Sequence, residues 1–144
     1  MVASTGMRIT IKGPLFGPRA NPIFIAGVQA GVQDLTEQGE DHVVSMARIR
    51  PAGVFLTVAQ AGRKNASKGH YARSISSVVR RLRAVISDGG VVYGPWLEGT
   101  SSRNQTTRFK GYAMFRKTRD WMQRHAEGIV DEHVRRAVRK LNGR

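Results

Sequence analysis

Apolar residues that recur every three or four positions predict a long helix near the start of the chain. Asn21-Pro22 is a typical helix start, because Asn accepts hydrogen bonds from free backbone N–H groups and Pro suits the first helical position. The apolar stripe predicts roughly seven to eight turns, and the helix should end before Pro51. Its members are Phe24, Val28, Val32, Leu35, Gly39, Val43 (or His42), Met46 and Ile49.

A second stripe with the same spacing predicts a helix over residues 117–141. Asn142-Gly143 is a suitable C-terminal stop, and the cations of the last turn complement the helix dipole. Lysines and arginines occupy much of the remaining helix surface. The stripe consists of Phe115, Met122, Ala126, Ile129, Val130, Val134 (or His133), Ala137 and Leu141.

Three glycines interrupt the first predicted helix, and each costs about 1 kcal/mol relative to alanine. Gly27 and Gly31 lie four positions apart on one side, a spacing that permits close packing of a neighbouring backbone. At Gly39 a kink is the simpler interpretation.

Strand patterns occupy two other parts of the chain. Residues 7–12 alternate apolar with polar or charged positions, as in a half-buried strand. Residues 71–87 fit a strand in which Val78, Leu82, Ala84 and Ile86 share a face interrupted by Arg80, or a helix that aligns Val78, Leu82 and Val85. The Asp88-Gly89-Gly90 turn signal and the strand-like residues 91–93 favour a hairpin that turns at 88–90.

These elements add up to an α+β fold, in which the long N-terminal amphipathic helix and the C-terminal helix pack on a small antiparallel β-sheet. At 144 residues the chain fits a single domain. Within residues 1–144 we expect a disordered tail over 1–6, a flexible basic loop over 62–70 and a polar loop over 99–108.

The charge is large and unevenly distributed. Formal net charge is +14, yet residues 1–62 carry five Lys or Arg against four Asp or Glu, so nearly all of the excess lies in residues 63–144. This asymmetry indicates a polyanionic neighbour, such as nucleic acid, an acidic protein surface or anionic lipid, rather than a merely solvated basic face. The cations that we expect to face DNA or an acidic partner are Arg63, Lys64, Lys68, Arg80, Arg81 and Arg83. For the first three, a solvated loop remains the alternative.

Catalytic and metal-binding patterns are missing from the sequence. There is no cysteine, the four histidines lack metal-ligand spacing, and neither of the two common phosphate-binding glycine motifs occurs. No apolar run approaches the roughly 20 residues of a membrane-spanning helix. We therefore expect no enzymatic activity, no cofactor, no metal and no membrane insertion.

The segment from Gly89 to Thr118 carries the most distinctive pattern. It reads Tyr93-Gly94-Pro95-Trp96-Leu97-Glu98-Gly99-Thr100, passes through a polar loop, and continues with aromatic residues at 109, 112 and 115. Trp96 suits hydrophobic core as well as a contact surface. The residues that we expect at a subunit or partner interface are Tyr93, Pro95, Trp96, Leu97, Glu98, Phe109 and Tyr112.

This segment resembles the neck, or tail-completion, proteins of long-tailed double-stranded DNA bacteriophages, in versions typical of actinobacterial phages. Those proteins carry Tyr-x-Pro-aromatic-aliphatic-Glu-x-Gly-Thr after a hairpin, which opens with Thr-Gly-x-x-x-x-Ser-Ile. Residues 68–75 match the opening except for Lys68 in place of Thr. Here Glu98 abuts Gly99 with no residue between them, and the usual Pro-Phe-Leu-x-Pro segment is replaced by residues 108–112. The Asp-Thr that usually stands before the first Gly of the pattern is also missing.

The resemblance implies a structural role at the joint between phage head and tail. The expected partners are further copies of the chain in a sixfold or twelvefold ring, the neighbouring head-connector and tail-tube proteins, and double-stranded DNA that passes without sequence readout. The protein would be made in the host cytoplasm and reside in the virion neck. The alternative function is that of a small non-specific nucleic-acid-binding protein.

Overall fold

The structure, a computed structural model, describes residues 5–11, 21–49 and 70–142. Its mixed helix-and-sheet architecture agrees with the predicted α+β class. The elements in chain order are β1 (Gly6–Thr10), α1 (Pro22–Ile49), α3 (His70–Ser74), β2 (Ser76–Arg80), β3 (Arg83–Ser87), α4 (Gly94–Glu98), α5 (Arg103–Thr106) and α6 (Met114–Leu141).

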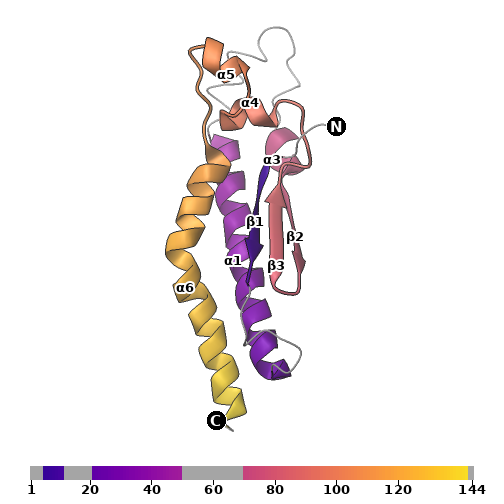
Figure 1. Cartoon of the computed structure of the whole chain (residues 1–144), viewed down its shortest axis with the longest axis vertical. Coiled ribbons are helices and arrows are strands. Elements are labelled where there is room, and N and C mark those ends of the chain that lie inside the picture. The colour runs from indigo at the N-terminus through magenta and orange to yellow at the C-terminus, as the bar shows by residue number, and fades with distance from the viewer. Residues whose placement is uncertain (1–4, 12–20, 50–69, 143–144) are drawn as a thin grey trace.

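Helices α1 and α6, each 28 residues long, lie side by side and run in opposite directions (Figure 1). The Asn21 side chain accepts a hydrogen bond from the N–H of Ile23 at 2.9 Å, as expected of a helix cap. The second helix begins at Met114, three residues earlier than the sequence predicted.

The glycines of α1 make close helix packing possible. A Cβ added at Gly27 would lie 2.5 Å from the Cβ of Ala137, and one added at Gly31 would lie 3.0 Å from the Cα of Val130. Both neighbours belong to α6, so the close packing predicted for these two glycines is confirmed. Gly39 is a packing position as well, because an added Cβ would lie 2.6 Å from the Sδ of Met122, and α1 continues through it as one helix.

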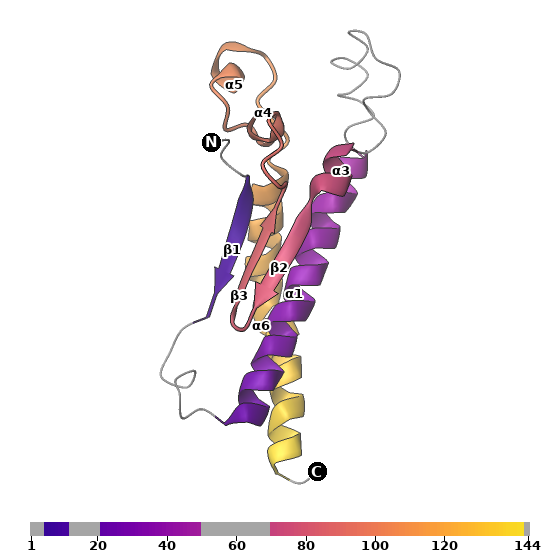
Figure 2. The ribbon, with the colours of Figure 1, turned by 90° about the vertical axis from the view of Figure 1, so that its right-hand side faces the viewer.

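The three strands form an antiparallel sheet in the order β1-β3-β2. Met7 pairs with Ile86 and Ile9 with Ala84, while Val78 pairs with Val85 on the other side of β3. Ala84 and Ile86 are buried against the helix pair, which lies behind the sheet in Figure 2. The opposite side of the sheet is turned to the viewer in that figure, and no described element covers it.

The sequence misplaced the hairpin. The hairpin turns at Arg81-Leu82, between β2 and β3, whereas the turn at 88–90 follows β3 and does not join two strands. Residues 91–93 form turns, since Pro95 stands at the beginning of a helix and cannot continue a strand ladder. The turn at 81–82 also separates residues that the sequence placed on one face. Ala84 and Ile86 point to the core, whereas Val78 is 55% exposed.

Two of the predicted loop segments contain regular structure. Gly6, assigned to the disordered tail, begins β1, and the polar loop 99–108 contains the helical turn α5. Residues 62–69 of the predicted basic loop lie outside the described residues, and His70 starts α3.

Candidate functional site

Residues 94–113 form a folded-back unit at the end of the helix pair opposite the C-terminus, here called the aromatic module (Figure 1). It begins with α4, whose first turn contains Pro95. The carbonyl oxygen of Pro95 accepts hydrogen bonds from the backbone N–H groups of Gly99, Thr100 and Ser101 at 2.8–3.2 Å. The chain therefore reverses directly after α4, and Gly99 permits this with a left-handed φ of 95°.

Asn104 holds the polar part of the aromatic module in place, although nothing in the sequence singled it out. Its side chain is buried and donates hydrogen bonds to the carbonyls of Trp96 at 3.0 Å and Phe109 at 3.1 Å. Its side-chain oxygen accepts a bond from the N–H of Ser101 at 3.0 Å. The side-chain amide of Asn104 therefore connects α4 to the segment of chain around Phe109.

The returning chain packs directly on the backbone of α4. The N–H of Tyr112 donates to the carbonyl of Leu97 at 2.7 Å. At Gly111, where φ is 88°, an added Cβ would lie only 2.3 Å from the Cα of Gly99. Two glycines are therefore required where the segments cross.

The predicted aromatic residues come together in the aromatic module. The ring centroids of Trp96 and Phe109 lie 4.5 Å apart, and those of Phe109 and Tyr112 lie 4.9 Å apart with an edge-to-face tilt. All three side chains are half-buried. Trp96 and Tyr112 also pack against the main core, so these rings serve the fold and still reach the surface.

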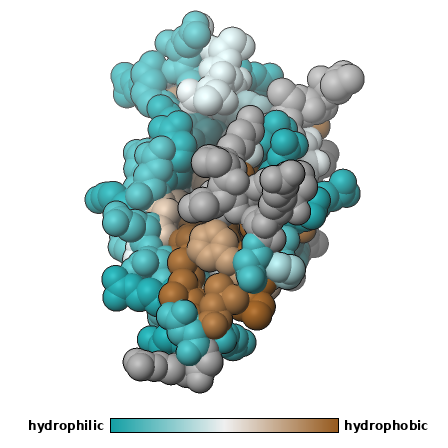
Figure 3. All heavy atoms as spheres, turned by 60° about the horizontal axis from the view of Figure 1, so that its bottom comes forward, coloured by the Kyte–Doolittle hydropathy of each residue, from teal (hydrophilic) through white to brown (hydrophobic). Residues whose placement is uncertain are grey.

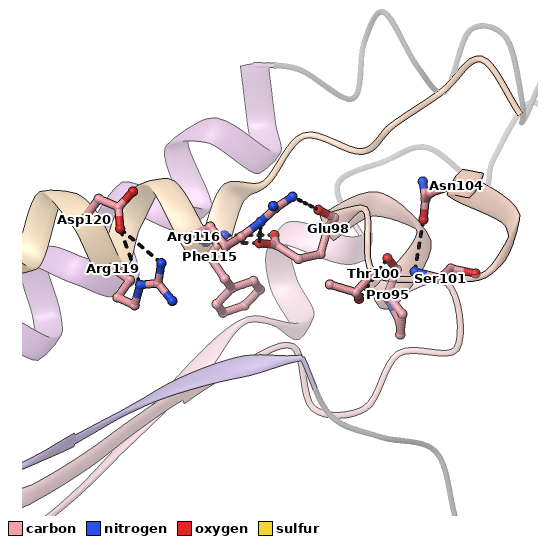
Figure 4. Close-up of polar contacts among 9 residues, drawn as sticks. All are labelled: Pro95, Glu98, Thr100, Ser101, Asn104, Phe115, Arg116, Arg119 and Asp120. Atoms are coloured by element: carbon pink, nitrogen blue, oxygen red, sulfur yellow. Dashed lines mark hydrogen bonds and ion pairs between the residues drawn. The ribbon is translucent and has the colours of Figure 1, made fainter. Parts of the chain in front are cut away.

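The side chain of Glu98 caps the N-terminus of α6, although the two are far apart in the sequence. Its two carboxylate oxygens accept hydrogen bonds from the N–H groups of Phe115 and Arg116, both at 3.0 Å (Figure 4). The Arg116 guanidinium lies 3.5 Å from the same carboxylate and donates to the backbone carbonyl of Glu98 at 3.1 Å. A negative charge is favourable here because the helix N-terminus carries free N–H groups and a partial positive charge.

This geometry divides the residues predicted for an interface. Leu97 and Glu98 are each 2% exposed and are used inside the chain, so in this conformation neither reaches a partner. Tyr93, just before the module, and Pro95, Trp96, Phe109 and Tyr112 within it are half-buried and still reach the surface. The accessible part of the residue set predicted for an interface is therefore centred on the aromatic rings.

A pocket of about 410 Å³ lies between the start of β1, α4 and the first turns of α6. Arg116 and Arg119 are at its wall, with side chains 53% and 57% exposed (Figure 4). Arg119 forms an ion pair with Asp120 at 3.2 Å. The carboxylate of Glu98, at the inner wall, is already bound to Arg116 and to the helix N-terminus. The remaining lining residues are Thr5, Gly6, Met7, Pro95, Thr100 and Phe115.

Asp88 is a buried junction, and not only the turn residue that the sequence indicated. It accepts hydrogen bonds from the N–H groups of Gly90 at 3.0 Å and Thr5 at 3.2 Å, and from the Tyr71 hydroxyl at 3.4 Å. Gly89 and Gly90 have φ values of 68° and 80°, as the turn requires. Burial and the Asp88 carboxylate raise the pKa of Tyr71 far above its usual range. The junction joins β1, α3 and β3 without any free group for catalysis.

The outer side of the sheet is strongly basic; we call it the basic sheet face. Arg80 and Arg83 are directly opposite each other in the β2–β3 register, and Arg8 lies across from Val85. Arg81 extends the face at the turn, with a positive φ of 52°. All four arginines are exposed, and none forms an ion pair with another described residue.

The structure thus unites half of the predicted cationic set. Arg80, Arg81 and Arg83 lie together on the basic sheet face, whereas residues 63, 64 and 68 are outside the described part of the chain. Arg8 belongs to the same face and was not among the predicted site residues. The period-two alternation of residues 7–12 could have indicated it, because that pattern points Arg8 away from the buried side of the strand.

The opposite end of the molecule is apolar. A groove of about 430 Å³ lies between the start of α1 and the end of α6. Ile23, Val138 and Leu141 are 40–44% exposed at this end, and Figure 3 shows apolar side chains gathered there. The groove is lined by Ile23, Ala26, Gly27, Ala30, His133, Arg136, Ala137 and Lys140.

The histidines connect the two long helices. The rings of His42 on α1 and His125 on α6 both stack on the indole of Trp121, with ring centroids 5.0 Å and 4.5 Å from it. His133 lies 2.9 Å from the carboxylate of Asp34, and this hydrogen bond lowers the pKa of Asp34. Among residues 5–11, 21–49 and 70–142, no group of three or more His, Asp or Glu could hold a metal ion.

The described helices also include none that is long and apolar enough to cross a membrane. A scan against protein-family models, a search of curated proteins and a search of solved structures found no match for the chain. The described residues thus present an aromatic module, a basic sheet face without ion pairs and an apolar end.

Proposed function

We propose that the chain is a structural protein of a bacteriophage virion that assembles into a ring around the DNA channel and joins head to tail. It acts by forming contacts and not by catalysis. The neighbouring head-connector and tail-tube proteins would contact the ring above and below, and double-stranded DNA would pass through it.

The observation that supports this proposal is the structural role of each characteristic residue in the segment 93–100. Pro95 begins α4, Glu98 closes the N-terminus of α6, and Gly99 takes the left-handed backbone conformation that reverses the chain. Three residues of the motif thus each build part of one folded unit, which supports the proposal that the motif reflects a shared fold. The resemblance to tail-completion proteins therefore gains weight from the geometry.

The uncovered basic sheet face fits the same proposal. Four arginines without described carboxylate partners give the molecule a surface that attracts any polyanion without base readout. Such a surface suits both of the negatively charged neighbours expected in a neck, DNA and acidic protein.

Disruption of the gene in the phage that encodes the chain tests the proposal. Electron microscopy should show DNA-filled heads beside separate, finished tails, and supplying the wild-type chain from a plasmid should restore joined particles. Intact, infectious particles without the gene would refute the joining role.

A matched pair of variants tests the aromatic module in the same complementation assay. Trp96→Ala removes the ring whose centroid lies 4.5 Å from that of Phe109, and we expect a folded chain that fails to join heads to tails. Val92→Ala changes a side chain that is 79% exposed at the same end and should restore joining. Circular dichroism on both purified variants separates a lost contact from a lost fold.

A second candidate function, non-specific nucleic-acid binding by a monomer, is favoured by the basic sheet face alone. It predicts an affinity for duplex DNA that is independent of sequence and falls steeply as salt concentration rises. It also predicts a monomer at every protein concentration. Sedimentation of the protein with and without DNA distinguishes it from the ring-forming role.

A further inference from the structure

We propose that the basic sheet face binds the acidic surface of α1 on a second copy of this chain, so that successive copies associate head to tail. The inference rests on the proposed function, because it assigns the two surfaces through which the ring closes. It follows from how charge and apolar area are divided over the described surface.

The acidic surface belongs to α1. Residues 22–47 contain four carboxylates and no Lys or Arg, and Asp34 is already bound to His133. The other three, Glu37, Glu40 and Asp41, have no ion pair among the described residues. At 3.6 residues per turn they share one side of the helix with the exposed Gln33, which donates a hydrogen bond to Glu37. We call this side the acidic α1 face.

The acidic α1 face cannot reach the basic sheet face of its own molecule. On α1, Val28, Val32, Leu35 and Val43 are buried against the sheet and α6, and the carboxylates lie on the far side of the helix from them. The basic sheet face points away from the same core (Figure 2). Neither face can therefore neutralise the other within one molecule, and a second copy supplies the opposite charge to each.

The basic sheet face is built for protein rather than for phosphate. Val78 is 55% exposed and lies directly opposite Val85, which is 37% exposed, so the middle of the face is apolar. A nucleic-acid backbone gains little from such a surface, whereas the exposed side of a helix that carries carboxylates can cover it. Covering one side of a sheet with a helix is also the ordinary way in which a domain buries apolar sheet surface.

Repulsion between arginines on neighbouring strands also favours a second copy of the chain as the partner. Arg80 and Arg83 are directly opposite in the β2–β3 register, and like charges at such positions destabilise a sheet. A carboxylate from a neighbouring copy would relieve this repulsion. The contact joins different surfaces on the two partners, so it is heterologous and can close into a ring.

Charge reversal with mixing tests the proposal on the full-length chain. The first variant, Arg80→Glu with Arg83→Glu, makes the sheet face acidic and keeps a like-charge pair in the sheet. The second, Glu37→Lys with Asp41→Lys, makes the α1 face basic and keeps like charges four residues apart. All four positions are exposed, so both variants should fold, and circular dichroism with thermal unfolding checks this.

Analytical ultracentrifugation should show an assembled wild-type chain, with each variant alone sedimenting as a monomer. An equimolar mixture should assemble again, because each acidic sheet face then meets a basic α1 face and each wild-type face meets its wild-type complement. Arg124→Glu with Arg139→Glu is the control: it changes net charge by the same amount on the exposed surface of α6 and should leave assembly intact.

Four results would overturn the inference in distinguishable ways. Assembly of both variants alone would refute the pairing of these two faces and leave the ring of the proposed function in place, formed through other surfaces. A wild-type chain that is monomeric at every concentration would refute the pairing together with the ring. If both variants are folded but their mixture does not assemble, complementary charge is excluded as the basis of the contact. If the sheet variant instead loses only duplex-DNA binding, the face belongs to nucleic acid.

Discussion

Replacing Glu98 with alanine removes the carboxylate that closes the N-terminus of α6. The buried N–H of Phe115 and the part-buried N–H of Arg116 each lose an acceptor at 3.0 Å. A buried donor left without a partner costs about 1–3 kcal/mol, and loss of a helix cap costs about 0.5–2 kcal/mol. Water can reach the second N–H in part, so we expect a loss of about 3 kcal/mol in the free energy of unfolding.

Two further variants separate capping from ion pairing. Glu98→Gln keeps one acceptor oxygen but brings its own N–H groups toward the helix donors, and should cost about half as much as the alanine change. Arg116→Ala removes the guanidinium at 3.5 Å, whose side chain is 53% exposed. Because exposed ion pairs contribute about 1 kcal/mol or less, this change should be the mildest of the three.

Urea unfolding followed by circular dichroism measures all three changes. In a domain of this size, a loss of about 3 kcal/mol lowers Tm by roughly 10 °C. Capping would be the wrong explanation if Arg116→Ala destabilised the chain as much as Glu98→Ala, because the charge pair would then carry the stability. A loss below about 1 kcal/mol for Glu98→Ala would show that the helix terminus finds other acceptors.

Four other substitutions give expectations of either sign. Gly111→Ala places a Cβ 2.3 Å from the Cα of Gly99 at a φ of 88°, and urea unfolding should show a loss of at least about 3 kcal/mol. Gly27→Ala would place a Cβ 2.5 Å from a side-chain carbon of α6 and should destabilise the fold by about 1–3 kcal/mol. Gly128 has open space around it, so Gly128→Ala should stabilise the fold by up to about 1 kcal/mol. Thermal unfolding should therefore show shifts of opposite sign for the two variants. Burial lowers the pKa of His42 below 6.5, so the unfolded chain takes up a proton at higher pH than the folded chain does. The free energy of unfolding should therefore fall as pH drops below about 6.5. His42→Gln should flatten that part of the stability–pH curve, and an unchanged slope would contradict the assignment.

The helices were predictable because their information is local. The spacing of Val28, Val32 and Leu35 is set by one helical face, and Asn21-Pro22 marks the helix start within two residues. The close packing at Gly27 and Gly31 was predictable for the same reason, because two glycines four positions apart leave room on one side of the helix for a neighbouring backbone.

The hairpin and the aromatic module depended on information that is not local. Arg81-Leu82 carries no glycine or asparagine, so the true turn was masked by the stronger signal at 88–90. Glu98 meets its partners 17 and 18 residues later, and Asn104 bonds two carbonyls that become neighbours only after the chain reverses. Nothing in the spacing of these residues announces such contacts.

The same distinction explains the basic sheet face. Composition shows the excess of cations, but only the strand register shows that Arg80 and Arg83 are opposite each other with Arg8 one row away. A chain that kept these arginines only for solubility would gain by spreading them, because repulsion across the strands costs stability. These arginines are concentrated around Val78 and Val85, and the α1 carboxylates without an ion pair among the described residues lie on another side of the molecule. This division of charge is what a chain requires if its neighbour in an assembly is itself.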